Sequence, residues 1–275
     1  MSFLFLQHME RCENMKCVLK YPGAKNRLAS WICSYIPAHQ VYLEPYFGSG
    51  AVFFNKEPVK IETINDLHGE VVNYFKVIRD KTEQLASLLQ LTPYARDEYE
   101  NSFSIKEGET DVERARKFAV RCWQGFGCSN LYKNGFRTSQ QSNSPHTTKE
   151  WRELPERVIQ ANKRLLNAQI ENLPALELIN RYNTEDVFIY VDPPYLLNTR
   201  KRNLYLYEMS DEEHVQLLTL LKKHKGQILI SGYDNDLYND MLKGWNKVYK
   251  PNQVEQGLIR TETLWMNYET GQLML

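Results

Sequence analysis

The chain has 275 residues, of which 42% are hydrophobic and 25% are charged, and its formal net charge is zero. This composition is ordinary for one large globular domain and excludes collagen-like, coiled-coil and intrinsically disordered chains. No apolar run approaches the ~18 residues that a membrane-spanning helix needs, and the five cysteines form no C-x-x-C pair, which argues against a disulfide framework or zinc site and for reduced thiols in a cytoplasm.

The first fourteen residues carry little weight, because Met15 is a candidate alternative start, and the apolar Met1–Leu6 lacks the basic leader of a signal peptide. After them, strand-like and helical runs alternate. We predict a strand, a tight turn, a short helix, a second strand and a helix with apolar residues at helical spacing: Val41–Glu44, Pro45–Gly50, Ala51–Lys56, Ile61–Asn65, and the segment carrying Val71, Val72, Phe75 and Ile78.

Residues 81–165 differ in character from the rest of the chain. Predicted helices at Thr82–Gln90 and Val112–Trp123 are followed by a polar stretch, Gly125–Thr148, that is too long for a plain connection in a compact domain. Residues 111–170 hold eleven Lys or Arg against five Asp or Glu, and the polar stretch has no acid at all. Such a basic insertion is compatible with phosphate contact, although a solvated loop would look the same.

The alternation resumes after a predicted helix at Pro155–Leu166. Further strands are predicted at Ala168–Glu171, Val187–Val191, Gln227–Ser231, Lys247–Lys250 and Thr263–Asn267, and further helices at Ala175–Tyr182, Asp211–Lys223 and Leu237–Leu242. Ser210 followed by three acids is a good start for the second of these helices. About seven strands alternating with helices indicate an α/β fold with a mostly parallel sheet.

The sharpest motif is Asp192-Pro193-Pro194-Tyr195, which directly follows the apolar strand Val187–Val191. In an open parallel sheet, ligands bind at the carboxyl ends of strands. Two prolines fix two φ angles and remove two N–H donors, so the segment is stiff and offers acceptors without competing donors. The alternative interpretation is that the motif is only a strand end followed by a Pro-Pro turn, with no role in ligand binding.

A carboxylate, rigid carbonyls and a tyrosine ring suit the exocyclic amine of a nucleobase. The lone pair of such an amine is delocalised into the ring, which makes it a poor nucleophile. Hydrogen bonds to Asp192 and to the Pro193 carbonyl would pull the nitrogen toward tetrahedral geometry and stabilise developing positive charge, while Tyr195 stacks on the base. Neither a covalent enzyme intermediate nor a metal is needed.

A second motif, Glu44–Ala51, follows the first strand and contains Gly48 and Gly50, which allow close approach of a ligand and positive φ. Asp66 ends the second strand, where an acid typically accepts hydrogen bonds from ribose hydroxyls, although Asn65-Asp66 could equally be a turn or a cap. Upstream, Tyr21–Lys25 is a glycine-containing loop whose lysine suits a cofactor carboxylate; taken alone, a solvated lysine is the simpler interpretation.

Taken together and in this order, these motifs resemble the Dam-like, alpha-group N6-adenine DNA methyltransferases. That family has a Gly-Lys loop, an E-P-F-x-G-x-G loop, a recognition insertion and D-P-P-Y; here they correspond to Lys20–Lys25, Glu44–Gly50, residues 81–165 and Asp192–Tyr195. Ser231–Tyr233 and Arg260–Tyr268 are similar to the family's later strands, especially in phage and prophage members.

The resemblance implies a Rossmann-like seven-stranded sheet with one antiparallel strand, the S-adenosylmethionine-dependent methyltransferase fold. Residues 15–80 and 166–275 would form the catalytic domain and 81–165 the target-recognition insertion. It implies that S-adenosylmethionine binds at the following residues: Tyr21, Lys25, Glu44, Phe47, Gly48, Gly50, Asp66, Asn172 and Asp192. Pro22-Gly23-Ala24-Lys25 departs from the commoner Ala-Gly-Gly-Lys.

Double-stranded DNA is the expected partner, and two groups of residues are candidates to bind it: Lys133, Asn134, Arg137 and Ser139, and the basic trio Arg200, Lys201 and Arg202. The Asn134-Gly135 dipeptide favours a hairpin turn, as in the family's recognition hairpin, but the residues usually downstream are missing, so a GATC target does not carry over. We expect a monomer or weak dimer in the cytoplasm of a bacterial or phage-infected cell, with a cognate restriction endonuclease as a further possible partner.

Three alternatives remain open. N4-cytosine methylation uses the same chemistry, but related cytosine enzymes usually carry Ser at the position of Asp192. A catalytically idle DNA-binding protein could keep the fold, yet nothing in Asp192–Tyr195 is degraded. An RNA or protein methyltransferase is the third, because a basic insertion does not distinguish RNA from DNA.

Overall fold

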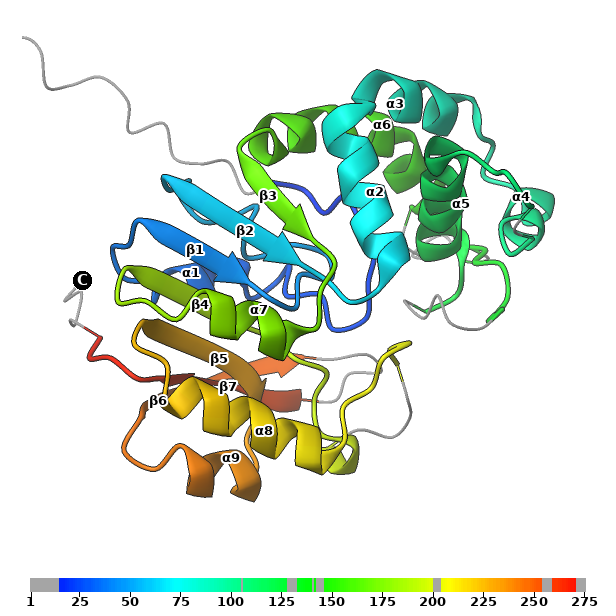
Figure 1. Ribbon diagram of the computed structural model, residues 1–275. Coiled ribbons are helices and arrows are strands. Elements are labelled where there is room, and N and C mark those ends of the chain that lie inside the picture. Colours follow the sequence, from blue (N-terminus) through cyan, green and yellow to red (C-terminus); the bar gives the residue numbers. More distant parts are fainter. Residues whose placement is uncertain are drawn as a thin grey trace, which may run out of the picture.

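The computed structural model describes residues 15–104, 106–127, 133–139, 141, 146–199, 204–253 and 259–270. A seven-stranded sheet forms the centre, with strands β1 (Val41–Glu44), β2 (Ile61–Asn65), β3 (Ala168–Glu171), β4 (Val187–Val191), β5 (Gln227–Tyr233), β6 (Asn246–Gln253) and β7 (Ile259–Met266). Their order is β3-β2-β1-β4-β5-β7-β6, and only β7 runs antiparallel to its neighbours (Figure 1). The predicted fold class, a mostly parallel seven-stranded sheet with one antiparallel strand, is confirmed.

Both faces of the sheet are buried, which explains why its central strands have continuous apolar sequences. Side chains alternate across a strand, so Tyr42, Phe188 and Tyr190 pack with the helices of one face. Leu43 and Ile189 face the other layer, which is formed by α7 (Ala175–Arg181), α8 (Asp211–Lys222) and α9 (Asp236–Met241). As predicted, Ser210 caps α8, in a reciprocal capping box with Glu213.

The strand order reverses between β1 and β4. From β1 the chain moves outward through β2 to β3, and it then returns to place β4 on the opposite side of β1. Helix α1 (Ala29–Cys33) precedes β1, and α2 (Gly69–Asp80) follows β2 on this path. Such a switch point opens a crevice at the carboxyl ends of the two strands, which is where ligands bind in open α/β sheets.

Four helices form most of the segment between α2 and β3: α3 (Thr82–Leu91), α4 (Arg96–Asn101), α5 (Asp111–Gln124) and α6 (Thr147–Leu165). They gather beside α2 at one end of the sheet (Figure 1). Buried Trp151 fastens α6 to the end of α3 through a 2.8 Å hydrogen bond from its indole N–H to the Thr92 carbonyl. Among the described residues, no helix combines the length and apolar character needed to cross a membrane.

Two local predictions are corrected, and two short helices were not predicted. Residues 51–56 form turns rather than a helix, because residues 51–54 are all buried and Asn55 donates its side chain back to the Ala51 carbonyl. Helix α6 begins eight residues before Pro155, because a buried stripe that includes Trp151 and Leu154 continues the helical face past the proline. Helices α1 and α4 were not predicted; each is short and buries few apolar side chains.

The predicted hairpin turn at Asn134-Gly135 is also corrected. Gly135 has a positive φ of 99°, but its carbonyl accepts from the Phe126 N–H, and Phe136 forms an antiparallel bridge with Gly125. Gly135 is therefore part of the pairing itself and does not connect two paired strands. The pairing brings the chain back against the end of α5, where it is held at the edge of the helical segment.

Candidate active site at the carboxyl edge of the sheet

A cavity of about 300 Å³ opens at the switch point between β1 and β4. This volume lies at the lower end of the ~300–1,000 Å³ found for small-molecule sites. Loops from five parts of the chain supply its wall: Tyr21–Lys25, Glu44–Ser49, Asn65–His68, Pro174–Leu176 and Tyr205–Met209, excepting Leu206 in the last. Asp192 and Pro194 close the side nearest β4.

Most of the residues predicted from the sequence meet in this wall. Tyr21, Lys25, Glu44, Phe47, Gly48, Asp66, Asp192 and Pro194 all line the cavity, whereas Gly50, Asn172, Pro193 and Tyr195 are outside the lining. Exposed Asn172 instead donates to the carbonyls of Asp66 (2.7 Å) and Leu67 (3.2 Å), so it braces the loop after β2.

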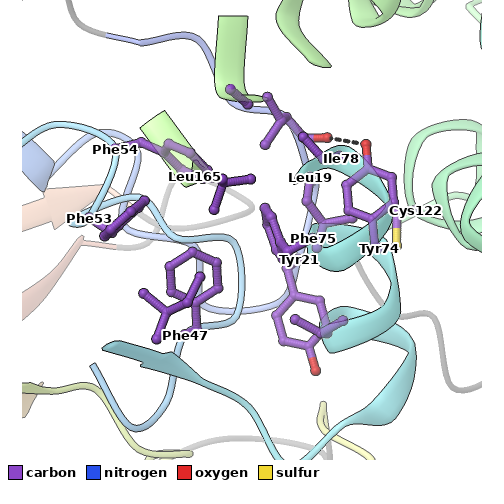
Figure 2. Close-up of a cluster of buried hydrophobic side chains, with 14 of the residues drawn as sticks. Leu19, Tyr21, Phe47, Phe53, Phe54, Tyr74, Phe75, Ile78, Cys122 and Leu165 are labelled. Carbon is purple, nitrogen blue, oxygen red and sulfur yellow. Dashed lines mark hydrogen bonds between the residues drawn. The ribbon is translucent and has the colours of Figure 1, made fainter. Parts of the chain in front are cut away.

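The loop after β1 owes its shape to two glycines and a buried ring. Gly48 and Gly50 have φ values of 51° and 69°, and a Cβ at Gly50 would lie 2.3 Å from the Phe47 ring. Phe47 packs edge-on against Phe75, with ring centroids 4.8 Å apart, within the aromatic cluster shown in Figure 2. A side chain at residue 50 would therefore displace the anchor that holds the loop beside the cavity.

Asp66 joins this loop to the start of α2. One carboxylate oxygen accepts from the Gly48 N–H and the other from the His68 N–H, both at 2.8 Å. Burial raises the pKa of Asp66 to about 6, and the two backbone donors act against that rise. Tyr21 reaches the same corner, where its hydroxyl lies 3.2 Å from His68 Nδ1.

Glu44, the last residue of β1, is buried under the cavity floor. Its carboxylate accepts a 2.6 Å hydrogen bond from the Tyr42 hydroxyl. Burial raises the pKa of Glu44 to about 8; the Tyr42 bond counteracts this, and the nearby charge of Asp192 adds to it. A cationic ligand in the cavity would therefore stabilise the ionised form of both Glu44 and Asp66, the acids at the ends of β1 and β2.

Asp192 is held at both oxygens. Lys25 Nζ lies 2.8 Å from Oδ2, and the Ser231 hydroxyl donates to Oδ1 over 2.8 Å. Lys25 also donates to the Gly23 carbonyl (2.9 Å), and only 7% of its side chain is exposed. Burial alone would lower the pKa of Lys25, but the charges of Asp192 and Glu262 outweigh it and raise the pKa, so the ammonium stays protonated. Lys25 thus contacts the acid of the Asp-Pro-Pro-Tyr motif directly.

Two members of this network were missed as site residues. Ser231 ends the apolar run of β5, and Glu262 is a buried acid on β7 that accepts a hydrogen bond from the Tyr195 hydroxyl. Glu262 Oε1 also lies 3.9 Å from Lys25 Nζ. A polar residue at the end of an apolar run is a signal for Ser231, whereas β7 carries several polar residues and its sequence does not single out Glu262.

The wall segment Leu204–Met209 was also missed as part of the site. Tyr205 and Tyr207 line the cavity, and Glu208 holds the segment in shape by accepting from the backbone N–H groups of Leu204 (2.6 Å) and Tyr205 (3.0 Å). The Tyr205 hydroxyl lies 2.1 Å from where a Cβ of Gly23 would be, and Gly23 has a φ of 71°. This close approach places the wall segment Leu204–Met209 against the loop that carries Lys25.

The candidate DNA-binding residues are only partly described. Lys133, Asn134 and Ser139 are exposed, and Arg137 is half-buried. The Arg137 backbone is fixed on both sides, because its N–H donates to the Gln124 carbonyl and its carbonyl accepts from the Tyr94 hydroxyl, both at 2.8 Å. The trio Arg200, Lys201 and Arg202 lies outside the described residues.

The charges of the cavity wall favour a cationic ligand. Its lining includes Asp66, Glu208 and Glu213, together with Glu44, whose raised pKa means that a cationic ligand would favour its ionisation. Lys25, the one Lys or Arg among the described lining residues, is already paired with Asp192. A sulfonium compound with a nucleoside moiety fits such a wall, since acids can meet its positive charge and a carboxylate at the end of β2 can accept from a ribose. Across the described residues, no cluster of three or more His, Cys, Asp or Glu side chains could hold a metal ion.

Comparison with known proteins gives a consistent picture. The chain is 27% identical over 252 residues to the Type II methyltransferase M1.LlaDCHI of Lactococcus lactis subsp. cremoris, covering 85% of this chain and 86% of that protein. It is 24% identical over 263 residues to the Type II methyltransferase M.MjaIII of Methanocaldococcus jannaschii, covering 84% and 89%. The family model for D12 class N6 adenine-specific DNA methyltransferases matches residues 21–256. That match spans every loop of the cavity wall, and the chain belongs to the D12 class of N6 adenine-specific DNA methyltransferases.

Proposed function

We propose that this enzyme methylates an adenine flipped out of duplex DNA, and that Asp192 accepts a hydrogen bond from the N6 amino group of that adenine. The observation that best supports this proposal is the position of Asp192 in the wall of an acidic cavity, where Lys25 and Ser231 hold its carboxylate in place. A fixed acceptor needs no reorganisation when charge develops on the amine, which is the condition for strong electrostatic stabilisation.

The other residues of the motif complete the proposed base recess. Pro193 and Pro194 keep the loop stiff, and the Pro193 carbonyl is proposed to accept the second N6 hydrogen. Tyr195 is proposed to stack on the base; its hydroxyl is held by Glu262 and its ring lies under Lys25 Nζ, 4.7 Å from the ring centroid. Asp192 and Tyr195 thereby orient the nitrogen lone pair.

S-adenosylmethionine is the cofactor that membership of the family implies, and when bound it supplies a methyl group on a positively charged sulfur. We propose that Asp66 accepts from the ribose, that Phe47 and Gly48 contact the ligand, and that Glu44 and Tyr21 line its path. Gly50 and Asn172 are proposed to act indirectly, through Phe47 and through the loop after β2. Because Lys25 contacts Asp192, its proposed place shifts from the cofactor carboxylate to the base recess.

The direct test is the chemistry on DNA. Genomic DNA from a host that lacks adenine methylation would be incubated with enzyme and cofactor, digested, and its nucleosides measured by mass spectrometry. We expect N6-methyladenine. N4-methylcytosine without N6-methyladenine would favour the cytosine alternative, and cofactor binding without any methylated product would favour an idle DNA-binding protein. A competition assay between duplex DNA and RNA tests which nucleic acid is the substrate.

We further propose that residues 15–80 and 166–275 form the catalytic domain and that 81–165 recognise the target. The exposed Lys133, Asn134 and Ser139, with Arg137 beside them, are proposed to contact DNA. Replacing Lys133 and Arg137 by Ala should weaken binding and reduce its salt dependence, because fewer counterions are then released. The same experiment on Arg200, Lys201 and Arg202 tests their proposed phosphate contacts; an unchanged salt slope would count against them.

The order of motifs supports an alpha-group, Dam-like arrangement of phage or prophage type, and the Type II names of the relatives support a restriction–modification role with a cognate endonuclease. We propose a monomer or weak dimer that acts in the cytoplasm of a bacterial or phage-infected cell, where its DNA lies. Sequencing of expression-host DNA with modification calling would reveal the target sequence, and light scattering of the purified protein would give its mass in solution.

A further inference from the structure

We propose that Glu262, on the antiparallel strand β7, is a positioning residue for methyl transfer: it orients Tyr195 and shares the charge of Lys25 with Asp192. The proposal rests on the proposed role of Asp192 in polarising the adenine amine. From the sequence, β7 is matched only as one of the family's later strands and none of its residues has a predicted role in the site, so the role of Glu262 follows from the structure.

Glu262 is a buried carboxyl group that contacts both Tyr195 and Lys25. Only 2% of its surface is exposed, the Tyr195 hydroxyl donates to Oε1, and the same oxygen lies 3.9 Å from Lys25 Nζ. Its strand position is fixed by pairing with Tyr233 of β5 and with Lys250 of β6. The Tyr233 ring in turn meets the Tyr195 ring edge-on, with centroids 4.7 Å apart.

A lysine between two carboxylates has a consequence for the recess. If Lys25 faced Asp192 alone, the pair would be neutral and the field at the adenine amine would be weak. Burial raises the pKa of Glu262, and the charge of Lys25 acts against that rise. When Glu262 is ionised, two negative charges face one positive charge, so the recess keeps a net negative charge. Positive charge developing on N6 is then stabilised by more than the Asp192 hydrogen bond alone, because charges interact strongly in a water-excluded site.

The second consequence concerns the ring of Tyr195. Its hydroxyl is fixed by Glu262, and Lys25 Nζ lies over the ring, 4.7 Å from its centroid. These contacts restrain both the tilt and the position of the ring, and Glu262 touches both members of that arrangement. A base that stacks on Tyr195 therefore meets a platform that Glu262 holds in place.

The chain offers a matched control for a buried, lysine-paired glutamate. Glu62 on β2 is 1% exposed, lies 2.5 Å from Lys56 Nζ and also pairs with Arg164, but it does not line the cavity. Glu62→Gln removes a buried carboxylate from the same sheet without touching the recess. It shows how much of any effect comes from generic loss of a buried charge.

The experiment compares wild type, Glu262→Gln and Glu62→Gln by steady-state kinetics on unmethylated genomic DNA, by titration with S-adenosylmethionine, and by thermal unfolding. For Glu262→Gln we expect kcat to fall about 10- to 100-fold with cofactor affinity within about twofold of wild type, as loss of one nearby charge predicts. Glu62→Gln should lower Tm while leaving kcat within about twofold. Glu262→Asp, which keeps the charge, should recover part of the lost rate.

A kcat for Glu262→Gln within about twofold of wild type, or an equal loss in Glu62→Gln, would overturn the proposal. If Glu262→Gln does not fold, Tyr195→Phe tests the proposal, because it deletes only the hydroxyl that donates a hydrogen bond to Glu262. We expect kcat to fall at least about threefold with cofactor affinity retained, and unchanged turnover would overturn the proposal. Absence of N6-methyladenine from the wild-type reaction would instead refute the proposed function, so the two failures are distinguishable.

Discussion

Replacing Asp192 by Asn tests the proposed role of this carboxylate in methyl transfer, because it keeps the shape of the side chain, removes the charge and replaces one acceptor oxygen by an NH2 donor. Lys25 Nζ lies 2.8 Å from Asp192 Oδ2 and 3.9 Å from Glu262 Oε1, so Glu262 is the carboxylate that still faces Lys25 when Asp192 is replaced. Removal of one group that stabilises developing charge costs about 100- to 1,000-fold in kcat, or ~2.7–4 kcal/mol. We therefore expect turnover of Asp192→Asn to fall by at least about 100-fold.

The same substitution also affects stability, and the two effects have to be separated. Breaking a buried ion pair costs ~3–5 kcal/mol, but the Asp192 side chain is 17% exposed and Glu262 still faces Lys25, so a loss of about 2 kcal/mol is expected. For a chain of this size that lowers Tm by roughly 4–8 °C. The protein would remain folded at 25 °C, and its kinetics could be measured there.

The assay is a single-turnover reaction with excess enzyme, labelled S-adenosylmethionine and unmethylated genomic DNA, with cofactor affinity measured separately. Asp234→Asn is the matched control, because Asp234 follows β5 at the same sheet edge and pairs with Lys247, but does not line the cavity. The control should retain the wild-type rate. If Asp192→Asn methylated adenine at more than about a tenth of the wild-type rate while folded, the proposed role of Asp192 would be refuted.

Three further predictions concern the cavity wall and the helical segment. Asp66 has a pKa raised to about 6, and a ribose hydroxyl needs the ionised carboxylate, so cofactor affinity should fall as pH drops through 6, by about tenfold at pH 5 in calorimetric titrations. Gly23→Ala should weaken cofactor binding and lower Tm, because the new Cβ meets the Tyr205 hydroxyl, and adding Tyr205→Phe should restore part of both. Pro155→Ala should raise Tm by roughly 2–4 °C, because it restores an N–H donor for the Trp151 carbonyl inside α6.

Each of these predictions has a control that isolates its cause. Asp66→Asn should remove the pH dependence of cofactor affinity between pH 5 and 7; if it persists, another group is responsible. Gly108 has a φ of 75° and nothing within 4 Å of its would-be Cβ, so Gly108→Ala measures the backbone strain alone. An equal effect of the two glycine substitutions would exclude the proposed contact with Tyr205. A lower Tm for Pro155→Ala would mean that the proline packs better than alanine.

The sequence determined the sheet and the motifs that end its strands. Parallel strands that are covered on both faces have continuous apolar sequences, so a run such as Val187–Val191 can be recognised as a buried strand from the sequence alone. Ligand sites form where such strands end, which is why Glu44, Asp66 and Asp192 could be named as a set before their positions were known. Local rules were less reliable where burial overrode them, as in the turns at 51–56 and the start of α6 at Thr147.

The partners of those motif residues were decided by tertiary structure alone. Lys25 and Asp192 are 167 residues apart, and neither residue type carries a signal for the other. Ser231 and Glu262 reach the recess only because β5 and β7 are neighbours in the sheet, with Ser231 opposite Leu264 and Tyr233 opposite Glu262. Strand order follows from how the whole chain buries its apolar surface, and no local pattern encodes it. The sequence alone can therefore predict which carboxylates belong to the site, whereas the packing of distant strands decides which groups hold those carboxylates in position.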